Sequence, residues 1–177
     1  MIELQGENFS LRQIVPEDYA LITQWNFDPE ITRYFSPRPS FSEELQKQWF
    51  ENLLNDKTKL KFMIIPKNKR DAVGMVGLQN INRLHERAEV GISIGDNKWL
   101  GKGLGTDAVK TLLSFSFEEL KLHQIRAEVF TENTNAIRLF IRCGFKSDGI
   151  LRHYWKKEGV FRDVQLLSLL KDEFTVK

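Results

Sequence analysis

A glycine-rich segment, residues 95–106, restricts what this chain can fold into more than any other feature of its sequence. It lies between an apolar strand pattern and an amphipathic helix pattern, and glycine occupies positions 101, 103 and 105. Because glycine has no Cβ, such a segment can curl tightly and aim several backbone N–H groups at one point. The N-terminus of the following helix adds partial positive charge. The segment therefore predicts a site for phosphate or pyrophosphate; the alternative is a connector that uses glycine only for its turn.

Two familiar phosphate-binding motifs fit this segment less well. A P-loop needs Ser or Thr after its Gly-Lys pair, but Gly101-Lys102 is followed by Gly103. A dinucleotide fingerprint would match residues 103–108 if Ala108 took the place of the third glycine. That fingerprint follows its strand directly, whereas about eight residues separate the strand from Gly103 here. A nucleotide-binding module therefore stays open as a weaker alternative.

Hydrophobic periodicity predicts the order β-α-α-α-β-β-β-α-β-α-β-β. Pro16 and Pro29 stand at the first positions of two expected helices, and Ser40 and Glu43 have the spacing of a capping box. We expect strands at 9–14, 61–65, 73–81, 89–94, 125–130, 145–151 and 163–170, and helices from Tyr19, over 31–35, from Ser40, over 103–120 and over 133–142. Because this order contains a single βαβ unit, it indicates an α+β fold with a mixed sheet rather than a doubly wound sheet or a barrel.

Composition narrows the class of protein. Hydrophobic side chains make up 41% of the 177 residues, which is enough for one sizeable core, and we expect a single domain over residues 1–177. The formal net charge of +2 argues against a dedicated nucleic-acid-binding surface. No apolar run approaches the roughly 18 residues of a membrane span, and Glu3, Glu7 and Arg12 interrupt any secretory signal. We expect a cytoplasmic protein without nucleic-acid or membrane partners.

The cysteine and histidine content argues against disulfides and metal. Cys143, the single cysteine, cannot form an internal disulfide and is expected to be a small buried hydrophobic residue. His85, His123 and His153 lack the spacing of metal ligands, so no catalytic metal is expected. A homo-oligomer stays open, because an edge strand or an exposed aromatic patch leaves no readable signature in the sequence.

The glycine-rich segment also resembles the pyrophosphate motif of the GNAT superfamily of acetyl-CoA-dependent N-acetyltransferases. The match is Lys98-Trp99-Leu100-Gly101-Lys102-Gly103, with Lys where the motif has Gln or Arg. A second family signature is matched by Asn133, Ala136 and Gly144-Phe145. Residues 87–92 and 163–170 resemble the branch that contains the ribosomal-protein alanine N-acetyltransferases and spermidine acetyltransferase. The resemblance covers roughly the whole chain.

The resemblance implies a fold and a cofactor site. The expected fold has a central, mostly antiparallel sheet that splays between two parallel strands, residues 89–94 and 125–130, with helices at its sides. Pantetheine would lie in the gap between these strands, and the pyrophosphate would lie on the amides of residues 101–106. The residues implied to bind acetyl-CoA are Gly91, Ile92, Ser93, Ile94, Lys98, Trp99, Leu100, Gly101, Lys102, Gly103, Leu104, Gly105, Thr106, Asn133, Ala136, Phe140 and Arg142.

Acetyl transfer to an amine requires a base, because an alkylammonium group with a pKa of about 10 has no free lone pair. Glu89 is the first candidate, since it shares a strand face with Gly91 and Ser93 near the expected thioester. Its alternative role is that of a salt-bridged carboxylate. His85, in the loop before the strand, is the second candidate, and its alternative role is that of an exposed loop side chain.

One position departs from the family pattern. Phe140 lies seven residues after Asn133, where many relatives have a tyrosine that protonates the leaving thiolate. Because phenylalanine has no proton to donate, we expect Phe140 only to pack against pantetheine.

The acceptor amine is the least determined part of the prediction. Aromatic side chains of the N-terminal helices and of the last hairpin are candidates for its walls, namely Trp25, Tyr34, Phe35 and Tyr154, with Trp49, Trp155 and Arg162 nearby. The first expectation is a protein N-terminus. The alternatives are a small-molecule amine (a polyamine, an amino sugar or an antibiotic) and a non-catalytic sensor of acyl-CoA.

Overall fold

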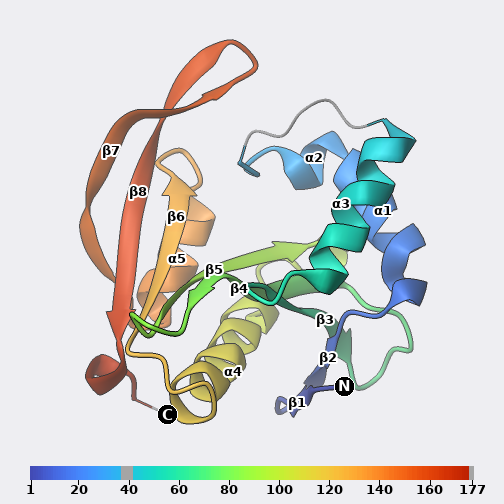
Figure 1. Cartoon of the computed structure of the whole chain (residues 1–177), viewed down its shortest axis with the longest axis horizontal. Helices are drawn as coiled ribbons and strands as arrows, with labels where there is room; N and C mark the ends of the chain where they lie inside the picture. Colours follow the sequence, from blue (N-terminus) through green and yellow to red (C-terminus); the bar gives the residue numbers. More distant parts are fainter. Residues whose placement is uncertain (37–41, 176–177) are drawn as a thin grey trace.

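A mixed sheet forms the centre of the protein (Figure 1). The structure is a computed structural model that describes residues 1–36 and 42–175. Within these residues the sheet has eight strands in the order β1-β2-β3-β4-β5-β6-β8-β7. Their bounds are Glu3–Gln5 (β1), Phe9–Gln13 (β2), Leu60–Pro66 (β3), Gly74–Asn82 (β4), Arg87–Ile94 (β5), Gln124–Phe130 (β6), Lys146–Lys157 (β7) and Val160–Leu170 (β8).

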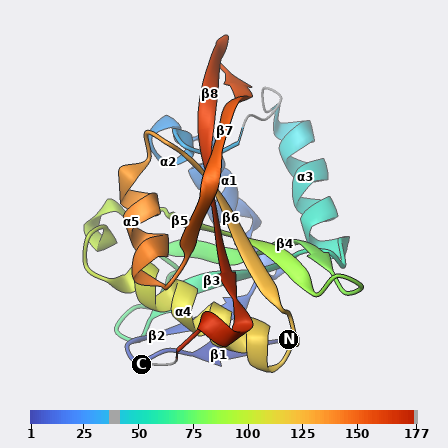
Figure 2. The same ribbon diagram turned by 90° about the vertical axis from the view of Figure 1, so that its left-hand side faces the viewer.

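Helices cover the two faces of the sheet (Figures 1 and 2). Their bounds are Tyr19–Phe27 (α1), Pro29–Thr32 (α2), Glu43–Asn55 (α3), Leu104–Glu118 (α4) and Thr134–Arg142 (α5). Alternate residues of β3 serve the two faces, as a strand requires. Phe62 and Ile64 enter the core beneath α4, whereas Met63 packs in a second cluster with Ile22 of α1 and Phe50 of α3. No helix in the described parts of the chain is long and apolar enough to cross a membrane.

One parallel pair distinguishes the sheet. β5 and β6 are connected through α4 and pair in parallel from Arg87↔Gln124 to Glu89↔Arg126, where the pairing ends. Beyond that point β5 stays paired with β4 and β6 stays paired with β8, so the inner edges of the two strands separate. All other neighbouring strands pair in the antiparallel sense. The expected fold, a mostly antiparallel sheet that splays between two parallel strands, is confirmed.

Several boundaries differ from those expected. Ser42 rather than Ser40 caps α3, because its hydroxyl accepts the N–H of Leu45; Ser40 itself lies outside the described residues. α2 ends at Thr32 instead of extending to residue 35. β1 is a three-residue edge strand, too short to produce a periodic signal.

The last two strands are longer than expected and project from the sheet as an arm (Figure 2). Most residues of β7 are exposed or half-buried, so its outer part carries no alternation of apolar and polar side chains. Such a segment gives no period-2 pattern to read, which explains why the expected strands stopped at residue 151 and began at residue 163.

Candidate active site

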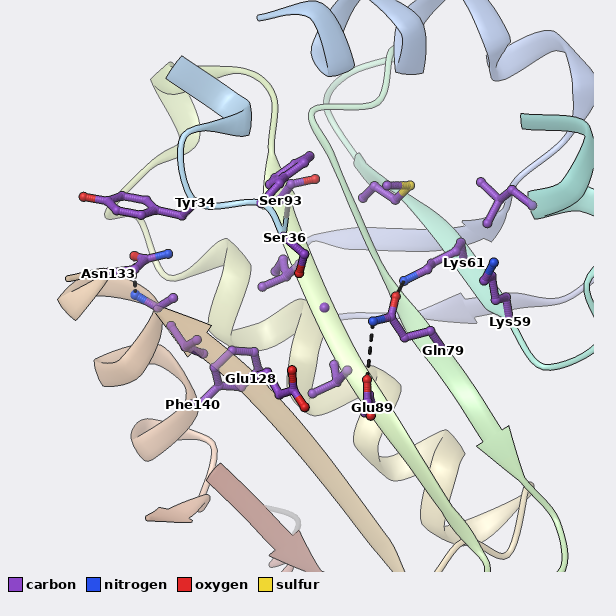
Figure 3. A pocket seen from close by; sticks show the side chains of 18 of the residues that line it. Tyr34, Ser36, Lys59, Lys61, Gln79, Glu89, Ser93, Glu128, Asn133 and Phe140 are labelled. Atoms are coloured by element: carbon purple, nitrogen blue, oxygen red, sulfur yellow. Dashed lines mark hydrogen bonds between the residues drawn. The ribbon is translucent and has the colours of Figure 1, made fainter. Parts of the chain in front are cut away.

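A cavity of about 330 Å³ opens where β5 and β6 separate, below α2 and α3 (Figure 3). β5 forms its floor, and a Cβ built on Gly91 would have no atom within 4 Å. The space above Gly91 is therefore open. Of the residues predicted for the site, those that line this cavity are Tyr34, Phe35, Trp49, Glu89, Gly91, Ile92, Ser93, Asn133, Ala136 and Phe140.

The glycine-rich segment adopts the backbone conformation that alternate glycines permit. Gly101 and Gly103 have φ angles of +73° and +85°, which L side chains rarely adopt, and a Cβ on either would point into open space. Gly105 instead allows close packing, since a Cβ there would lie 3.0 Å from Cδ1 of Leu139 in α5. Two of the three glycines thus serve the turn, and the third brings α4 against α5.

The N-terminus of α4 points its first amides out of the helix. The first intrahelical bond joins the N–H of Asp107 to the carbonyl of Gly103 at 3.1 Å, so the N–H groups of residues 104–106 precede the helical hydrogen-bond ladder. The segment before them is anchored at Asp96. The ammonium of Lys69 and the N–H of Lys98 donate to its carboxylate and lower the pKa of Asp96. This turn offers an anion several donors from a held backbone.

α5 forms the wall of the cavity across from α3. Asn133 caps this helix, its side-chain oxygen accepting the N–H of Ala136 at 3.2 Å. Phe140 is 3% exposed and packs edge-on against Phe145, with ring centroids 5.1 Å apart. The ring of Phe140 is therefore held in the core with one side on the cavity, which agrees with a packing role.

Glu89 lies in the cavity, but its carboxylate is already occupied. Arg126 donates to one oxygen at 2.9 Å, and Asn80 and Gln79 donate to the other at 2.9 and 3.5 Å. Asn80 has a φ of +52° at an irregularity in the β4–β5 register, and this turns its amide toward Glu89. These bonds match the salt-bridged carboxylate that the sequence analysis gave as the alternative role of Glu89.

Glu128 is a second carboxylate in the cavity, and the sequence analysis missed it. It points in from β6, across the gap from β5 (Figure 3). Burial raises the pKa of Glu128, and the nearby negative charge of Glu89 raises it further; the charge of Arg126 and a hydrogen bond from Trp155 oppose this. A carboxylate with a raised pKa holds a proton more strongly than an ordinary one, as a general base at neutral pH must.

The remaining predicted residues lie outside the cavity. His85 is an exposed residue of the turn before β5, and Arg142 is exposed in the last turn of α5. Trp25 is buried beneath Gly95, where a Cβ would lie 2.2 Å from its indole ring, so its role is packing. Tyr154 is 47% exposed on β7 against Trp155. Ile94 and residues 98–106 follow the cavity-lining part of β5 along the chain.

The only cysteine lies in a buried environment, as the sequence predicts. Cys143 is buried, and burial raises the pKa of its thiol to about 12. Within the described residues no group of three or more His, Cys, Asp or Glu side chains is arranged to hold a metal ion.

Comparison with known proteins identifies the family. A family model described as an acetyltransferase (GNAT) domain matches residues 8–146. This chain belongs to the GNAT acetyltransferase family. GNAT acetyltransferases use acetyl-CoA, and the chain is accordingly an acetyl-CoA-dependent N-acetyltransferase.

Individual GNAT relatives span nearly the whole chain. The uncharacterized N-acetyltransferase p20 of Bacillus licheniformis is 35% identical over 178 residues, which cover 98% of this chain and 99% of that protein. Spermidine N(1)-acetyltransferase of Vibrio cholerae is 27% identical over 169 residues and 96% of each chain. A crystal structure of the Vibrio cholerae spermidine N-acetyltransferase with CoA and spermine matches with a TM-score of 0.86 at 27% identity, covering 95% of this chain and 98% of that one.

The GNAT cofactor fits the residues present. The open space over Gly91, Gly101 and Gly103 leaves room for a ligand to approach the backbone. The separated edges of β5 and β6 offer peptide groups along the same path, and the first amides of α4 lie at its end. These are the donors that a phosphate-containing chain with an amide-rich arm requires.

Proposed function

We propose that this GNAT enzyme acetylates a small primary amine, that Glu128 takes the proton from this amine, and that residues 1–177 act as one domain. Acetyl-CoA would supply the acetyl group as a thioester, whose carbonyl carbon is open to direct attack by an amine; the C–N bond forms, the C–S bond breaks and CoA leaves as its thiolate. The observation that carries the proposal is the position of Glu128, a carboxyl group with a raised pKa, in the cavity where β5 and β6 separate. The named activity of the spermidine acetyltransferases supports a small molecule over the protein N-terminus that the sequence favoured.

Glu128 and Glu89 have different roles in this proposal. An amine reaches the cavity mostly as its ammonium ion, which must lose a proton before it can react. Glu128 accepts this proton, because its raised pKa gives it the higher proton affinity that the task needs. Glu89 is held by its bonds to Arg126 and Asn80, and its nearby negative charge helps to raise the pKa of Glu128.

The backbone of β5 supplies the complementary stabilisation. Within the described residues the inner edge of β5 pairs with no strand beyond Glu89, so its N–H groups can face the gap. An N–H group held there would donate to the oxygen on which negative charge develops during transfer. Because β4 holds β5 from its other side, this donor needs no rearrangement when the charge forms.

The proposal is tested by acetyl-CoA-dependent release of free thiol over a panel of acceptors. The panel contains spermidine, short alkylamines, amino acids, amino sugars, aminoglycosides and peptides with free N-termini, with a control lacking acceptor. We expect turnover with at least one small amine and little with the peptides. Turnover with the peptides alone would contradict the proposal and would indicate that the acceptor is a protein N-terminus. If no acceptor of the panel is acetylated although CoA binds, the result would favour a non-catalytic sensor of acyl-CoA.

A further inference from the structure

A row of four residues crosses the sheet through the floor of the cavity. Lys61 of β3 pairs with Gly77 of β4, and Gly77 pairs with Gly91 of β5. Two residues beyond the last parallel pair, Glu89↔Arg126, Gly91 of β5 and Glu128 of β6 both line the cavity where the strands separate. The two ends of this row therefore carry opposite charges, and the two positions between them carry no side chains.

Because Gly77 and Gly91 have no side chains, the row forms a trough with Lys61 at one end and Glu128 at the other. Gly91 has open space above it, whereas the position above Gly77 is taken by the side chain of Lys61. A Cβ on Gly77 would lie 2.4 Å from Cδ of Lys61, so the methylene groups of Lys61 lie flat across β4. The absence of a side chain at position 77 thus lets Lys61 extend toward Gln79 and the cavity, which it lines together with Lys59 (Figure 3).

The spacing of this row suits a short molecule. Neighbouring strands lie roughly 4.8 Å apart, so the backbones of Lys61 and Glu128 are about 14 Å apart or more. The side chains of Lys61 and Glu128 occupy part of this distance from its two ends (Figure 3). What is left accommodates a ligand whose two charged groups are separated by a few carbon atoms.

The charges of the lining do not suit a polycation. Among the described residues that line the cavity, the carboxylates are Glu89 and Glu128, and Glu89 is bound to Arg126 at 2.9 Å. Lys59 and Lys61 line the same cavity, and Lys59 is bound to Asp56 at 2.9 Å in the same way. Like charges in a partly dehydrated site repel, so the charge of Lys61 disfavours an ammonium group beside it. A polyamine with one ammonium group at Glu128 would bring a further ammonium group toward Lys61.

We propose that the amine accepted by this enzyme also carries an anionic group, a carboxylate or a phosphate, which Lys61 binds while Glu128 faces the amine. This inference rests on the proposed function and specifies its substrate class. The acceptor lies along the trough with its two charged ends matched to the two ends of the row.

The experiment compares acceptors of one length and different charge. The acceptors 4-aminobutanoate, 1-aminobutane and 1,4-diaminobutane carry an anionic, a neutral and a cationic far end. A second pair, 3-aminopropyl phosphate and 3-aminopropanol, separates phosphate from carboxylate recognition. We expect kcat/KM for at least one of the two anionic amines to exceed that of its neutral partner and of 1,4-diaminobutane at least tenfold.

Substitutions of Lys61 test whether the trough causes the preference for anionic over neutral acceptors. Lys61→Met keeps the unbranched stem over Gly77 and removes the charge, and we expect the ratio of kcat/KM between anionic and neutral acceptors to fall at least tenfold. Lys61→Arg should keep most of the ratio, and Lys61→Glu should turn the preference toward 1,4-diaminobutane. Lys57→Met is the matched control, because Lys57 is exposed in the same segment and does not line the cavity.

Failure of this inference and failure of the proposed function give different results. Faster turnover of 1,4-diaminobutane than of both anionic amines, or a preference that survives in Lys61→Met, overturns the inference and leaves the acetyltransferase in place. If no amine is acetylated, calorimetric binding of 4-aminobutanoate and 1,4-diaminobutane to the wild type and Lys61→Met, with CoA present, tests the inference by itself. Tighter binding of the amino acid that depends on Lys61 supports it, and tighter binding of the diamine contradicts it.

Discussion

The two regions that meet at the gap between β5 and β6 are built in different ways. The proposed donor region, residues 91–94, 101–106 and Asn133, presents mainly backbone: glycines with positive φ, the first amides of a helix and an unpaired strand edge. The proposed acceptor region, Lys61, Gln79, Glu89 and Glu128, presents side chains from four different strands. One region depends on local conformation, and the other depends on how distant strands are placed in register.

This difference has a functional consequence. A region made of backbone groups continues to bind its ligand when side chains are substituted, so it suits an acetyl donor that a whole family shares. A region made of side chains alters its preference with single substitutions, so it suits an acceptor that differs between relatives. Four predictions test this division, from the largest expected effect to the smallest.

Of the four substitutions, replacement of Glu128 should have the largest effect, because it should lower the rate of acetyl transfer without changing the affinity for CoA. Glu128→Gln removes the base while keeping the size of the side chain, and we expect kcat to fall about 100-fold or more with CoA affinity within twofold of the wild type. In the wild type the rate should fall with decreasing pH through a pKa above the usual range of glutamate, and this limb should be absent from the variant. Glu132→Gln is the control, because Glu132 pairs with Arg162 outside the cavity. An unchanged pH profile in Glu128→Gln would contradict the assignment.

Replacement of Gly103 should instead weaken the binding of CoA. Gly103→Ala forces a Cβ onto a residue with φ +85°, at a strain of about 1–2 kcal/mol, and places it at the proposed pyrophosphate site. We expect CoA affinity, measured by calorimetry, to fall at least tenfold. Gly159→Ala carries a matched strain at φ +81° in the β7–β8 turn and should lower the melting temperature to a similar degree without changing CoA affinity. Equal losses of affinity in both variants would assign the effect to strain alone.

Lys157 tests whether the arm belongs to the acceptor region. Its ammonium group donates to the carbonyls of Thr32, Arg33 and Phe35 at 2.8, 2.8 and 3.0 Å, which joins the β7–β8 arm to the segment that carries Tyr34. In Lys157→Met we expect KM for the amine to rise severalfold with kcat and CoA affinity nearly unchanged. Steady-state kinetics of Lys156→Met provide the control, and a rise in KM for acetyl-CoA instead would place the arm in the donor region.

Phe140 should show the smallest effect. If its ring only packs, Phe140→Leu keeps an apolar surface at that place, and kcat should stay within about threefold of the wild type. A large loss of kcat with unchanged CoA affinity would show that the ring contributes to the chemistry. The thermal stability of the variant, measured in parallel, accounts for the contact with Phe145 that is lost.

The sequence predicted the donor region better than the acceptor region, for a physical reason. The conformation of Gly101 and Gly103 and the cap at Asn133 depend on neighbouring residues, so short motifs reveal them. Glu128 and Lys61 reach the cavity through strand register, which no local pattern encodes. A signal for Glu128 existed, because it is a charged residue on the open face of a strand whose other face is apolar.

The aromatic candidates lie in three different environments. Tyr34 and Phe35 do line the cavity, whereas Trp25 packs beneath Gly95 and Tyr154 lies exposed on the arm. A large aromatic side chain fits a core, a pocket or an exposed strand equally well in a helical or alternating pattern. Only the three-dimensional arrangement separates these three environments.

Hydrogen–deuterium exchange with and without CoA is the most direct test of the division between the two regions. We expect CoA to slow exchange of the amides of residues 101–106 and of the inner edge of β5, residues 91–94, and to leave exchange in α1, α3 and β3 unchanged. Protection confined to α1, α3 or β3, with none at residues 101–106, would contradict it.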